Sequence, residues 1–388
     1  MKQLKFMRQI FFGALIIFFI NQQFVGYALP SILGVTEWPC FRGDPQLKGR
    51  VNITISDKFE LKWRFQSEDM ITGTAVTWMN KVFIGSNDGK LYALNLYNSN
   101  KVWEFDTGDL IEASPLFVEG SVYVGTIDGT LYALNAFDGS LRWKFQTDGQ
   151  ISGSPNYYLS DSALHPWILV GSYDNYLYCL DSENGKLIWR YKTESYINST
   201  PAIEKGRVIV GGCDAELHII SAENGIELGK VSVETYVAAS PALSGDMAYI
   251  GNYEGTFFGI DIAQQKIIWK LPPSNGQGGY FSSPAISSEW IVIGSRDNSV
   301  IGIERASGKV LWRFMTGDEV LGSPLICNDK VVVGSVDGRL YILSLENGNK
   351  LWSYDIGEAI SGSPAISLNI IIIGAEDGAV YAFAASGK

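Results

Sequence analysis

Residues 322–352 read GSPLICNDKVVVGSVDGRLYILSLENGNKLW, and this stretch is one copy of a pattern that returns along the chain. The pattern combines Ser-Pro, a glycine ten residues after the proline, an acidic residue three residues after that glycine, and a tryptophan eighteen residues after it. Seven prolines and an alanine mark eight copies at steps of 40 to 46 residues: Ala75, Pro115, Pro155, Pro201, Pro241, Pro284, Pro324 and Pro364. A fixed period in this range is typical of solenoids, propellers and repeat arrays.

Each copy predicts four short antiparallel strands. The apolar runs 331–333 and 340–343 are joined across Asp337-Gly338, a pair that accepts the positive φ of a tight hairpin turn. Four strands in about 40 residues, repeated eight times, predict an all-β fold, an eight-bladed β-propeller of four-stranded antiparallel blades. The last copy, 362–385, lacks its fourth strand, so we predict that the strand at 59–69 completes this blade and closes the ring.

Most tryptophans occupy one register of the repeat. We expect each of these to dock its outer strand on the next blade, since aromatic side chains bury a large area: Trp63, Trp103, Trp143, Trp189, Trp269, Trp312 and Trp352. Gly229 stands at this register in the fourth copy. We therefore expect the weakest junction there, and a gain in stability from a tryptophan at this position.

The succession Ser-Pro, Gly-Ser-x-Asp-Gly, Leu-Tyr-Ala-Leu and Gly-x-x-x-Trp resembles the PQQ-like (pyrroloquinoline-quinone-like) repeat. The lead-in at 38–45, WPCFRGDP, is similar to the segment that opens many such propellers. The resemblance covers roughly residues 36–388 and implies the propeller fold. For function it implies several alternatives, because these repeats occur in quinoprotein alcohol dehydrogenases, in the outer-membrane assembly factor BamB and in other envelope proteins. Fold alone does not decide between them.

The first 28 residues differ from the rest of the chain. Lys2, Lys5 and Arg8 precede an apolar stretch at 10–20, and small residues follow at 26–28. This order predicts a secretory signal peptide at 1–28, because eleven apolar residues are too few to span a bilayer. An uncleaved anchor is the alternative. We expect a lead-in segment at 29–58, a propeller at 59–388, and a periplasmic or secreted location after cleavage.

Charge and cysteine usage limit the partners and the compartment. The net charge of −11 argues against nucleic acid, whose binding depends on neutralised phosphates. Four cysteines, Cys40, Cys179, Cys213 and Cys327, could form two disulfides, and their pairing stays open. Cys179 stands where other copies carry alanine, so we expect a buried thiol there. No cysteine directly follows the apolar stretch, which argues against a lipid anchor.

Residues suited to catalysis are few. The chain has two histidines, His165 in an insertion of the third copy and His218 at a core register, and we expect structural roles for both. The repeated acids are interpreted as turn residues rather than calcium ligands. Quinoprotein dehydrogenases hold their quinone against a disulfide of adjacent cysteines, and this chain has no adjacent cysteines. We therefore predict no enzyme activity, no cofactor and no metal; a PQQ- or metal-dependent oxidoreductase is the alternative.

A binding face is predicted where four copies depart from the repeat. The loop before each first strand and the loop between strands two and three lie at the same end of a blade, and tyrosine and arginine there are typical of binding hot spots. The predicted partner-binding residues are Tyr173, Tyr196, Tyr236, Tyr253, Tyr280, Phe281 and Arg296. Acids elsewhere on that end predict an acidic rim: Asp69, Asp109, Glu112, Asp148, Asp318, Glu319 and Glu358.

The resulting hypothesis is a monomeric, non-catalytic scaffold, similar to BamB, that recognises a cell-envelope protein or an extended ligand. A small-ligand or glycan-binding module using the central funnel is a further alternative. Peripheral association with a membrane stays open.

Overall fold

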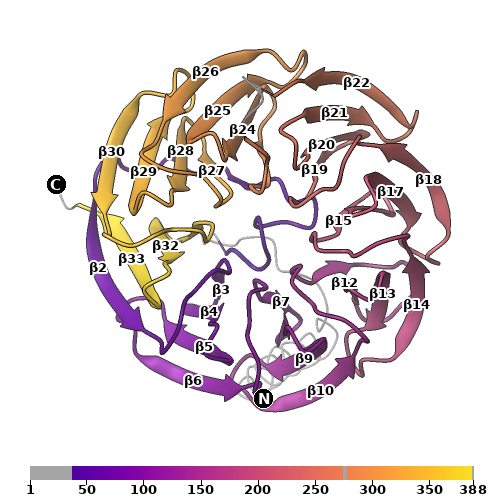
Figure 1. The fold of residues 1–388 in the computed structure, drawn as a ribbon. Helices are drawn as coiled ribbons and strands as arrows, with labels where there is room; N and C mark the ends of the chain where they lie inside the picture. The colour runs from indigo at the N-terminus through magenta and orange to yellow at the C-terminus, as the bar shows by residue number, and fades with distance from the viewer. Residues whose placement is uncertain (1–36, 274–277, 387–388) are drawn as a thin grey trace, which may run out of the picture. The chain divides into compact units, whose positions relative to one another are not determined.

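The computed structural model describes residues 37–273 and 278–386, and these residues form eight sheets arranged in a ring (Figure 1). The predicted eight-bladed β-propeller is therefore confirmed. In the described ranges every regular element is a strand, and none of the described residues form a helix long and apolar enough to cross a membrane. The predicted signal peptide lies outside the described residues, and so do residues 274–277, which precede Tyr280.

Each blade is built from consecutive strands, and their order in the sequence is their order from the axis outward. Blade 1 contains β3 (Val76–Trp78), β4 (Lys81–Gly85), β5 (Lys90–Asn95) and β6 (Lys101–Asp106), and blade 2 contains β7 (Leu116–Val118), β8 (Ser121–Gly125), β9 (Thr130–Asn135) and β10 (Leu141–Gln146). Blade 3 contains β11 (Asn156–Tyr158), β12 (Trp167–Gly171), β13 (Tyr176–Asp181) and β14 (Leu187–Lys192). Blade 4 contains β15 (Ala202–Glu204), β16 (Arg207–Gly211), β17 (Glu216–Ser221) and β18 (Glu227–Ser232).

The remaining blades repeat this order, with one exception in the last. Blade 5 contains β19 (Ala242–Ser244), β20 (Met247–Gly251), β21 (Phe257–Asp261) and β22 (Lys266–Leu271), and blade 6 contains β23 (Ala285–Ile286), β24 (Trp290–Ser295), β25 (Ser299–Glu304) and β26 (Val310–Met315). Blade 7 contains β27 (Leu325–Cys327), β28 (Lys330–Gly334), β29 (Arg339–Ser344) and β30 (Lys350–Asp355). Blade 8 contains β31 (Ala365–Ser367), β32 (Ile370–Gly374), β33 (Ala379–Ala385) and, as its outermost strand, the early strand β2 (Phe59–Gln66).

The ring closes through the N-terminal strand, as predicted. Strand β2 pairs antiparallel with β33, from Phe59 opposite Ala385 to Gln66 opposite Ala379. Indigo β2 and yellow β33 lie side by side in Figure 1. Closure satisfies the outer edge of β33, which would otherwise present unpaired backbone groups.

The tryptophan register does dock neighbouring blades. The indole of Trp103 in blade 1 covers Gly139 of blade 2 so closely that a Cβ on that glycine would overlap the ring. Its Nε1 donates to the carbonyl of Ala136 at 3.3 Å. Trp189 repeats the arrangement over Gly225, with Nε1 donating to Ala222 at 3.0 Å. The indole thus supplies apolar area and a polar link between blades.

The described part of the lead-in, residues 37–58, crosses the axis on one face, which the sequence did not predict. Its strand β1 (Arg50–Val51) adds to β27 as a parallel fifth strand of blade 7. Carbonyls of the segment accept backbone N–H groups from the innermost strands of blades 1, 2, 4, 5, 6 and 7, and the Pro45 carbonyl also accepts the Asn156 amide of blade 3 at 2.9 Å. The lead-in therefore closes the central opening on this face.

The lead-in itself carries a buried cation. The side chain of Arg42 is 1% exposed, and its Nη2 donates to the Pro324 carbonyl at 2.5 Å. Burial lowers the pKa of the Arg42 guanidinium to about 9, although the negative charge of Asp44 acts to raise it. Its Nε and Nη1 find no hydrogen-bond partner in the described part of the chain.

Candidate functional site

The loops opposite the lead-in bring the predicted binding positions together in pairs. In each blade the residue two after the repeat glycine donates its backbone N–H to the carbonyl on the loop before the first strand. Tyr253 donates to Tyr236 at 3.0 Å, and Cys213 donates to Tyr196 at 2.9 Å. These bonds hold side chains from two loops at one end of each blade.

Six of the predicted residues form two contiguous groups on this face. Tyr173 stacks on Tyr196 across the junction of blades 3 and 4, with ring centroids 5.2 Å apart and planes inclined by 5°. Tyr236 and Tyr253 of blade 5 lie 4.3 Å apart, and Tyr253 meets Phe281 edge-on at 5.5 Å.

Arg296 completes the second group. Its guanidinium lies 5.1 Å from the ring centroid of Phe281, and its Nε donates to Glu319 at 3.0 Å. Hydrogen bonds with Tyr236 and Arg296 lower the pKa of Tyr253, while desolvation and the hydrogen bond with Tyr253 raise the pKa of Tyr236 to about 12. We call these six residues the aromatic arc: Tyr173, Tyr196, Tyr236, Tyr253, Phe281 and Arg296.

Tyr280 does not belong to this surface. Its side chain is 4% exposed and packs edge-on against Phe257 at 5.6 Å, over Gly251. In the other seven blades this register holds a buried isoleucine or valine over the repeat glycine, as Ile111 lies over Gly85. Tyr280 therefore fills a core position. The isoleucine or valine at this register of the other copies indicates a core position in the sequence as well. The prediction that Tyr280 lies on an exposed face is wrong.

The apolar surface extends further than expected. Tyr196 is 51% exposed, and the same register carries Met70 in blade 1 and Leu110 in blade 2, which are 40% and 41% exposed. Neither residue belongs to the predicted set, which contains only aromatic side chains and arginine, although both share the repeat register of Tyr196. Of the expected acidic rim, Asp69 and Asp109 accept the backbone N–H of the next residue, so part of the rim also shapes its own loops.

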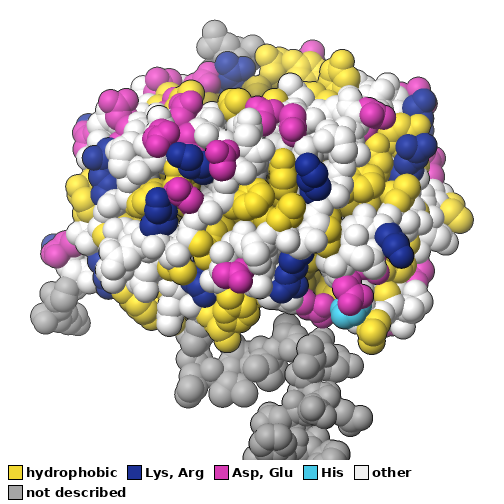
Figure 2. All heavy atoms as spheres, turned by 90° about the horizontal axis from the view of Figure 1, so that it is seen from below, with side chains coloured by type: hydrophobic (Ala, Val, Ile, Leu, Met, Phe, Trp, Pro, Cys, Tyr) yellow, Lys and Arg dark blue, Asp and Glu magenta, His cyan; other side chains and the backbone are white. Residues whose placement is uncertain are grey.

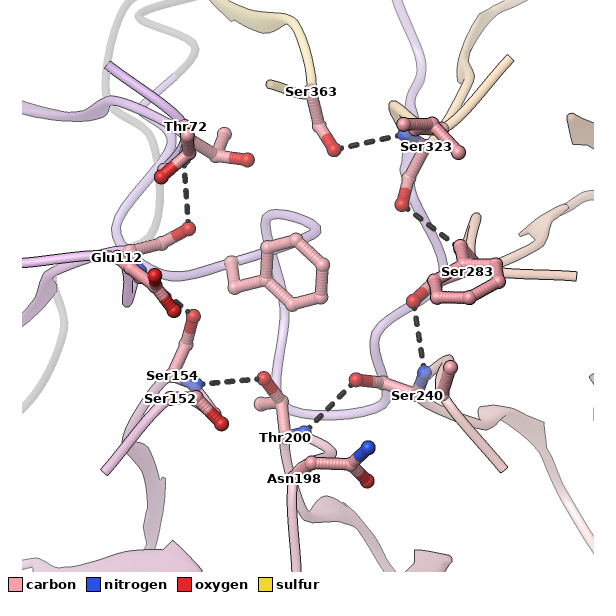
Figure 3. A pocket seen from close by; sticks show the side chains of 18 residues that line it. Thr72, Glu112, Ser152, Ser154, Asn198, Thr200, Ser240, Ser283, Ser323 and Ser363 are labelled. Carbon is pink, nitrogen blue, oxygen red and sulfur yellow. Dashed lines mark hydrogen bonds between the residues drawn. The ribbon is translucent and has the colours of Figure 1, made fainter. Parts of the chain in front are cut away.

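A central pocket of about 170 Å³ opens on the same face (Figure 3). Its wall is a ring of hydroxyl-bearing residues, one from each blade: Thr74, Ser114, Ser154, Thr200, Ser240, Ser283, Ser323 and Ser363. Seven hydrogen bonds of 2.8–3.1 Å follow this ring, each from a backbone N–H to the hydroxyl of the next blade. The serine of each Ser-Pro pair thus links neighbouring blades around the axis.

The rim of the pocket has a polar half and an apolar half. On the polar half, the buried oxygens of Thr72, Ser152 and Asn198 lack hydrogen-bond partners within the described residues. Glu112 supplies a carboxylate there, and Ala238, Phe281 and Leu321 line the apolar half. Buried polar atoms are usually satisfied, so these oxygens indicate groups that water or a ligand would satisfy. Phe281 belongs to both the pocket and the aromatic arc.

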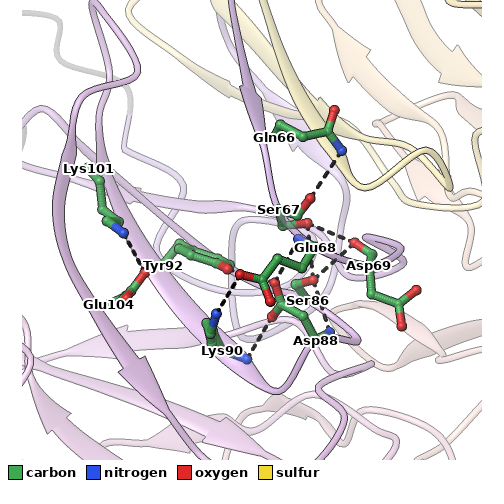
Figure 4. Close-up of polar contacts among 10 residues, drawn as sticks. All are labelled: Gln66, Ser67, Glu68, Asp69, Ser86, Asp88, Lys90, Tyr92, Lys101 and Glu104. Atoms are coloured by element: carbon green, nitrogen blue, oxygen red, sulfur yellow. Dashed lines mark hydrogen bonds and ion pairs between the residues drawn. The ribbon is translucent and has the colours of Figure 1, made fainter.

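The repeated acids lie in hairpin turns, as interpreted from the sequence (Figure 4). Asp88 accepts the Lys90 backbone N–H at 2.9 Å and the Tyr92 hydroxyl at 2.6 Å. His218 takes the place of this tyrosine in blade 4, where its Nε2 lies 2.9 Å from Asp214 and its Nδ1 3.0 Å from the Tyr191 hydroxyl. The acids therefore organise turns between strands.

The other chemistry-bearing side chains are dispersed. His165 lies between Glu119 and Glu183 at 3.4 and 3.5 Å. All four cysteines are free, and burial raises the pKa of the Cys40, Cys179 and Cys327 thiols. Within the described ranges no three His, Cys, Asp or Glu side chains are grouped so as to hold a metal ion. The outer wall shown in Figure 2 mixes acidic and basic side chains, so it has no field of a single sign.

The sequence matches the family described as outer membrane protein assembly factor BamB over residues 60–165, 162–280 and 266–388. The chain belongs to this family. No curated protein matches the sequence.

Solved structures share the fold at low sequence identity. BamB from Moraxella catarrhalis matches with a TM-score of 0.71 and 18% identity, covering 85% of this chain and 99% of that one. Quinohemoprotein alcohol dehydrogenase from Comamonas testosteroni matches with a TM-score of 0.78 and 14% identity, covering 91% and 81%. A europium-containing methanol dehydrogenase matches with a TM-score of 0.75 and 12% identity, covering 90% and 98%. The fold of this BamB-family chain is thus shared by an assembly factor and by enzymes.

Proposed function

We propose that the protein is a non-catalytic binding scaffold of the cell envelope, which captures a protein partner or another extended ligand on the aromatic arc. The observation that carries this proposal is the stacking of exposed aromatic side chains from blades 3 to 6 on backbone-fixed loops. Rigid aromatic side chains lose little conformational entropy when they are covered. The description of the family as an outer membrane assembly factor supports a protein partner in the envelope.

The surface suits a partner with both apolar and basic groups. Apolar side chains continue from the arc to Met70 and Leu110, while Glu319 and Glu358 mark the acidic side of the same face. Arg296 is paired with Glu319 and stacked on Phe281, so it adds a fixed donor at the edge of the arc. Charge complementarity of this kind sets orientation and association rate more than affinity.

The decisive experiment compares two variants in cross-linking and capture from the native envelope fraction. The triple variant Tyr196→Ser, Tyr236→Ser and Phe281→Ser removes the most exposed rings of the arc. Tyr97→Ser is the matched control, because Tyr97 is 43% exposed on a turn at the opposite end of blade 1. A partner captured by the wild type and the control but lost by the triple variant supports the proposal; capture that survives the triple variant overturns it.

The location is part of the same proposal. Residues 1–28 have the order of a signal peptide, so the mature protein would be periplasmic or secreted, with peripheral membrane contact only through its partner. The N-terminal sequence of protein purified from its native source tests this, since cleavage would place the new N-terminus near residue 29. An intact Met1 would contradict cleavage.

A second candidate function is small-ligand binding in the central pocket. The three buried oxygens without partners on its polar rim favour it, and Glu112 would select a neutral or cationic polar molecule such as a glycan. A redox enzyme remains the alternative from another class, since the fold is shared with quinoprotein dehydrogenases. The absorbance spectrum and metal content of native protein separate these: a quinone band with stoichiometric metal would replace the scaffold proposal.

A further inference from the structure

A second pocket, of about 420 Å³, lies on the opposite face, where the lead-in segment meets blades 5 and 6. The lead-in contributes Asp44, Lys48, Arg50 and Asn52 to its wall. The blades contribute Ser244 at the end of β19, Ile286 of β23, the turn at 287–288, and Arg305 after β25. These turns lie at the end of each blade opposite the aromatic arc, so this pocket is separate from the site described above.

Three cations face one carboxylate in this pocket, although the chain carries a net charge of −11. The Lys48 ammonium lies 3.9 Å from Asp44, a long separation for an ion pair. Arg50 has a buried Nε without a hydrogen-bond partner among the described residues. A buried donor left unpaired is unfavourable, so this arrangement would be relieved by an acceptor in the pocket.

Arg305 is held rigidly without being neutralised. Its Nε donates to the Tyr249 hydroxyl at 2.9 Å, its Nη1 to the Ser287 carbonyl at 2.8 Å, and its Nη2 to the Ser244 hydroxyl at 2.8 Å. Every one of these partners is uncharged. The guanidinium is therefore oriented in advance, while its positive charge remains available to an anion.

We propose that this pocket binds the phosphate group of a phosphate monoester. Arginine forks match the oxygens of a phosphate, and three cations against one carboxylate suit a group that carries nearly two negative charges. The pocket falls within the usual size range of small-molecule sites and exceeds the needs of a bare phosphate ion. Asn52, Ser287 and Ser288 would contact a polar body attached to the phosphate. The ester is either a free small molecule or a lipid headgroup, which share this chemistry.

The experiment is a calorimetric titration of the full chain with glycerol 3-phosphate, against glycerol at matched ionic strength. A parallel arm measures co-sedimentation with phosphatidylcholine vesicles with and without phosphatidic acid. Arg50→Gln and Lys48→Gln remove one pocket cation each. Lys186→Gln is the matched control, because Lys186 is an exposed cation on a turn of blade 3 at the same end of the ring.

We expect one phosphate site per chain and an affinity about ten- to hundredfold weaker in Arg50→Gln, as the loss of a charge-assisted hydrogen bond implies. The control should bind as the wild type does. If Arg50→Gln fails to fold, Lys48→Gln decides, because its backbone bond to Ile286 is retained. Binding only to phosphatidic acid vesicles, with the same sensitivity to Arg50, identifies a headgroup. Absence of both kinds of binding, or equal binding by wild type and pocket variants, overturns the proposal. Neither result bears on the aromatic arc, which lies on the other face.

Discussion

The side chain of Gln265 lies directly over Gly229, at the junction of blades 4 and 5, and its Nε2 donates to the Leu228 carbonyl at 2.9 Å. At other junctions the order is reversed, since a tryptophan such as Trp189 lies over a glycine such as Gly225. A glutamine on the turn has replaced the glycine, and a glycine on the strand has replaced the tryptophan. The junction is therefore filled from the opposite side.

This swap corrects the expectation that tryptophan at position 229 would by itself stabilise the ring. Gly229→Trp should overlap the Gln265 amide and destabilise the fold by about 1–3 kcal/mol, as overpacking usually does. Gln265 has φ +54°, so Gln265→Gly also suits the backbone of its turn. The double variant should recover part of the loss of Gly229→Trp, because the overlap is removed while residue 229 keeps its φ of +158°. Urea unfolding of the four proteins gives the coupling free energy, and additive effects would contradict the swap.

Tyr280 and Tyr196 should respond differently to truncation. Tyr280→Ala empties a core position at 4% exposure and should cost about 3–5 kcal/mol in unfolding free energy. Tyr196→Ala removes a ring that is 51% exposed and should change stability by no more than about 0.5 kcal/mol. Chemical denaturation measures both. Similar losses for the two variants would place Tyr196 in the core as well and weaken the proposed binding surface.

The hydroxyl ring predicts a stability role for the serine of Ser-Pro. Ser240→Ala removes the acceptor of the buried Thr200 N–H, which is bonded at 2.9 Å, and should cost about 1–3 kcal/mol. Ser232→Ala, on the exposed side of β18, is the control and should be near neutral. Thermal unfolding of the two variants is sufficient. Equal melting temperatures would show that the ring hydroxyls are replaceable by water from the pocket.

The Asp214–His218 pair predicts a pH dependence. Burial raises the pKa of Asp214, but the hydrogen bond and charge of His218, together with the backbone N–H groups of Glu216 and Glu194, outweigh it, so the pKa of Asp214 is lowered in the folded chain. A carboxyl with a lowered folded pKa stabilises the fold above its unfolded pKa of about 4, and this contribution is lost as pH falls through the folded value.

Asp214→Asn should therefore be less stable than the wild type at pH 6, and the two should converge in strong acid. His218→Tyr restores the pair seen between Tyr92 and Asp88 and is the matched variant, with folding retained. Unfolding free energies across pH 2–7 test this. A constant difference between wild type and Asp214→Asn over the whole range would exclude the linkage.

Much of the fold could be predicted because each copy of the repeat encodes the same local contacts, and the repeat occurs eight times. Ser-Pro, Asp-Gly and the tryptophan register each belong to a contact that every blade makes with itself or with its neighbour, so one copy explains the others. The prediction that β2 completes the last blade followed from counting strands, and it is confirmed by the pairing of Phe59 with Ala385. The exposed residues of the arc are departures from the repeat, whereas the prediction for Tyr280 is wrong because Tyr280 stands one residue later in the repeat than Tyr196, at the buried register that covers the repeat glycine.

The sequence by itself determined the number of blades, their strands, the closure of the ring and the end of the blades where aromatic side chains gather. Only the tertiary structure decided that the lead-in crosses the axis, that Gln265 fills the place of a missing tryptophan, and that Lys48, Arg50 and Arg305 share a pocket. The contact of Gln265 with Gly229 was missed because it departs from the repeat, whereas for the lead-in and its pocket the physical reason is distance along the chain. Periodicity encodes contacts within a blade and between adjacent blades, while the lead-in also joins segments far apart in the chain, such as Arg42 and Pro324, which meet only once the ring has closed.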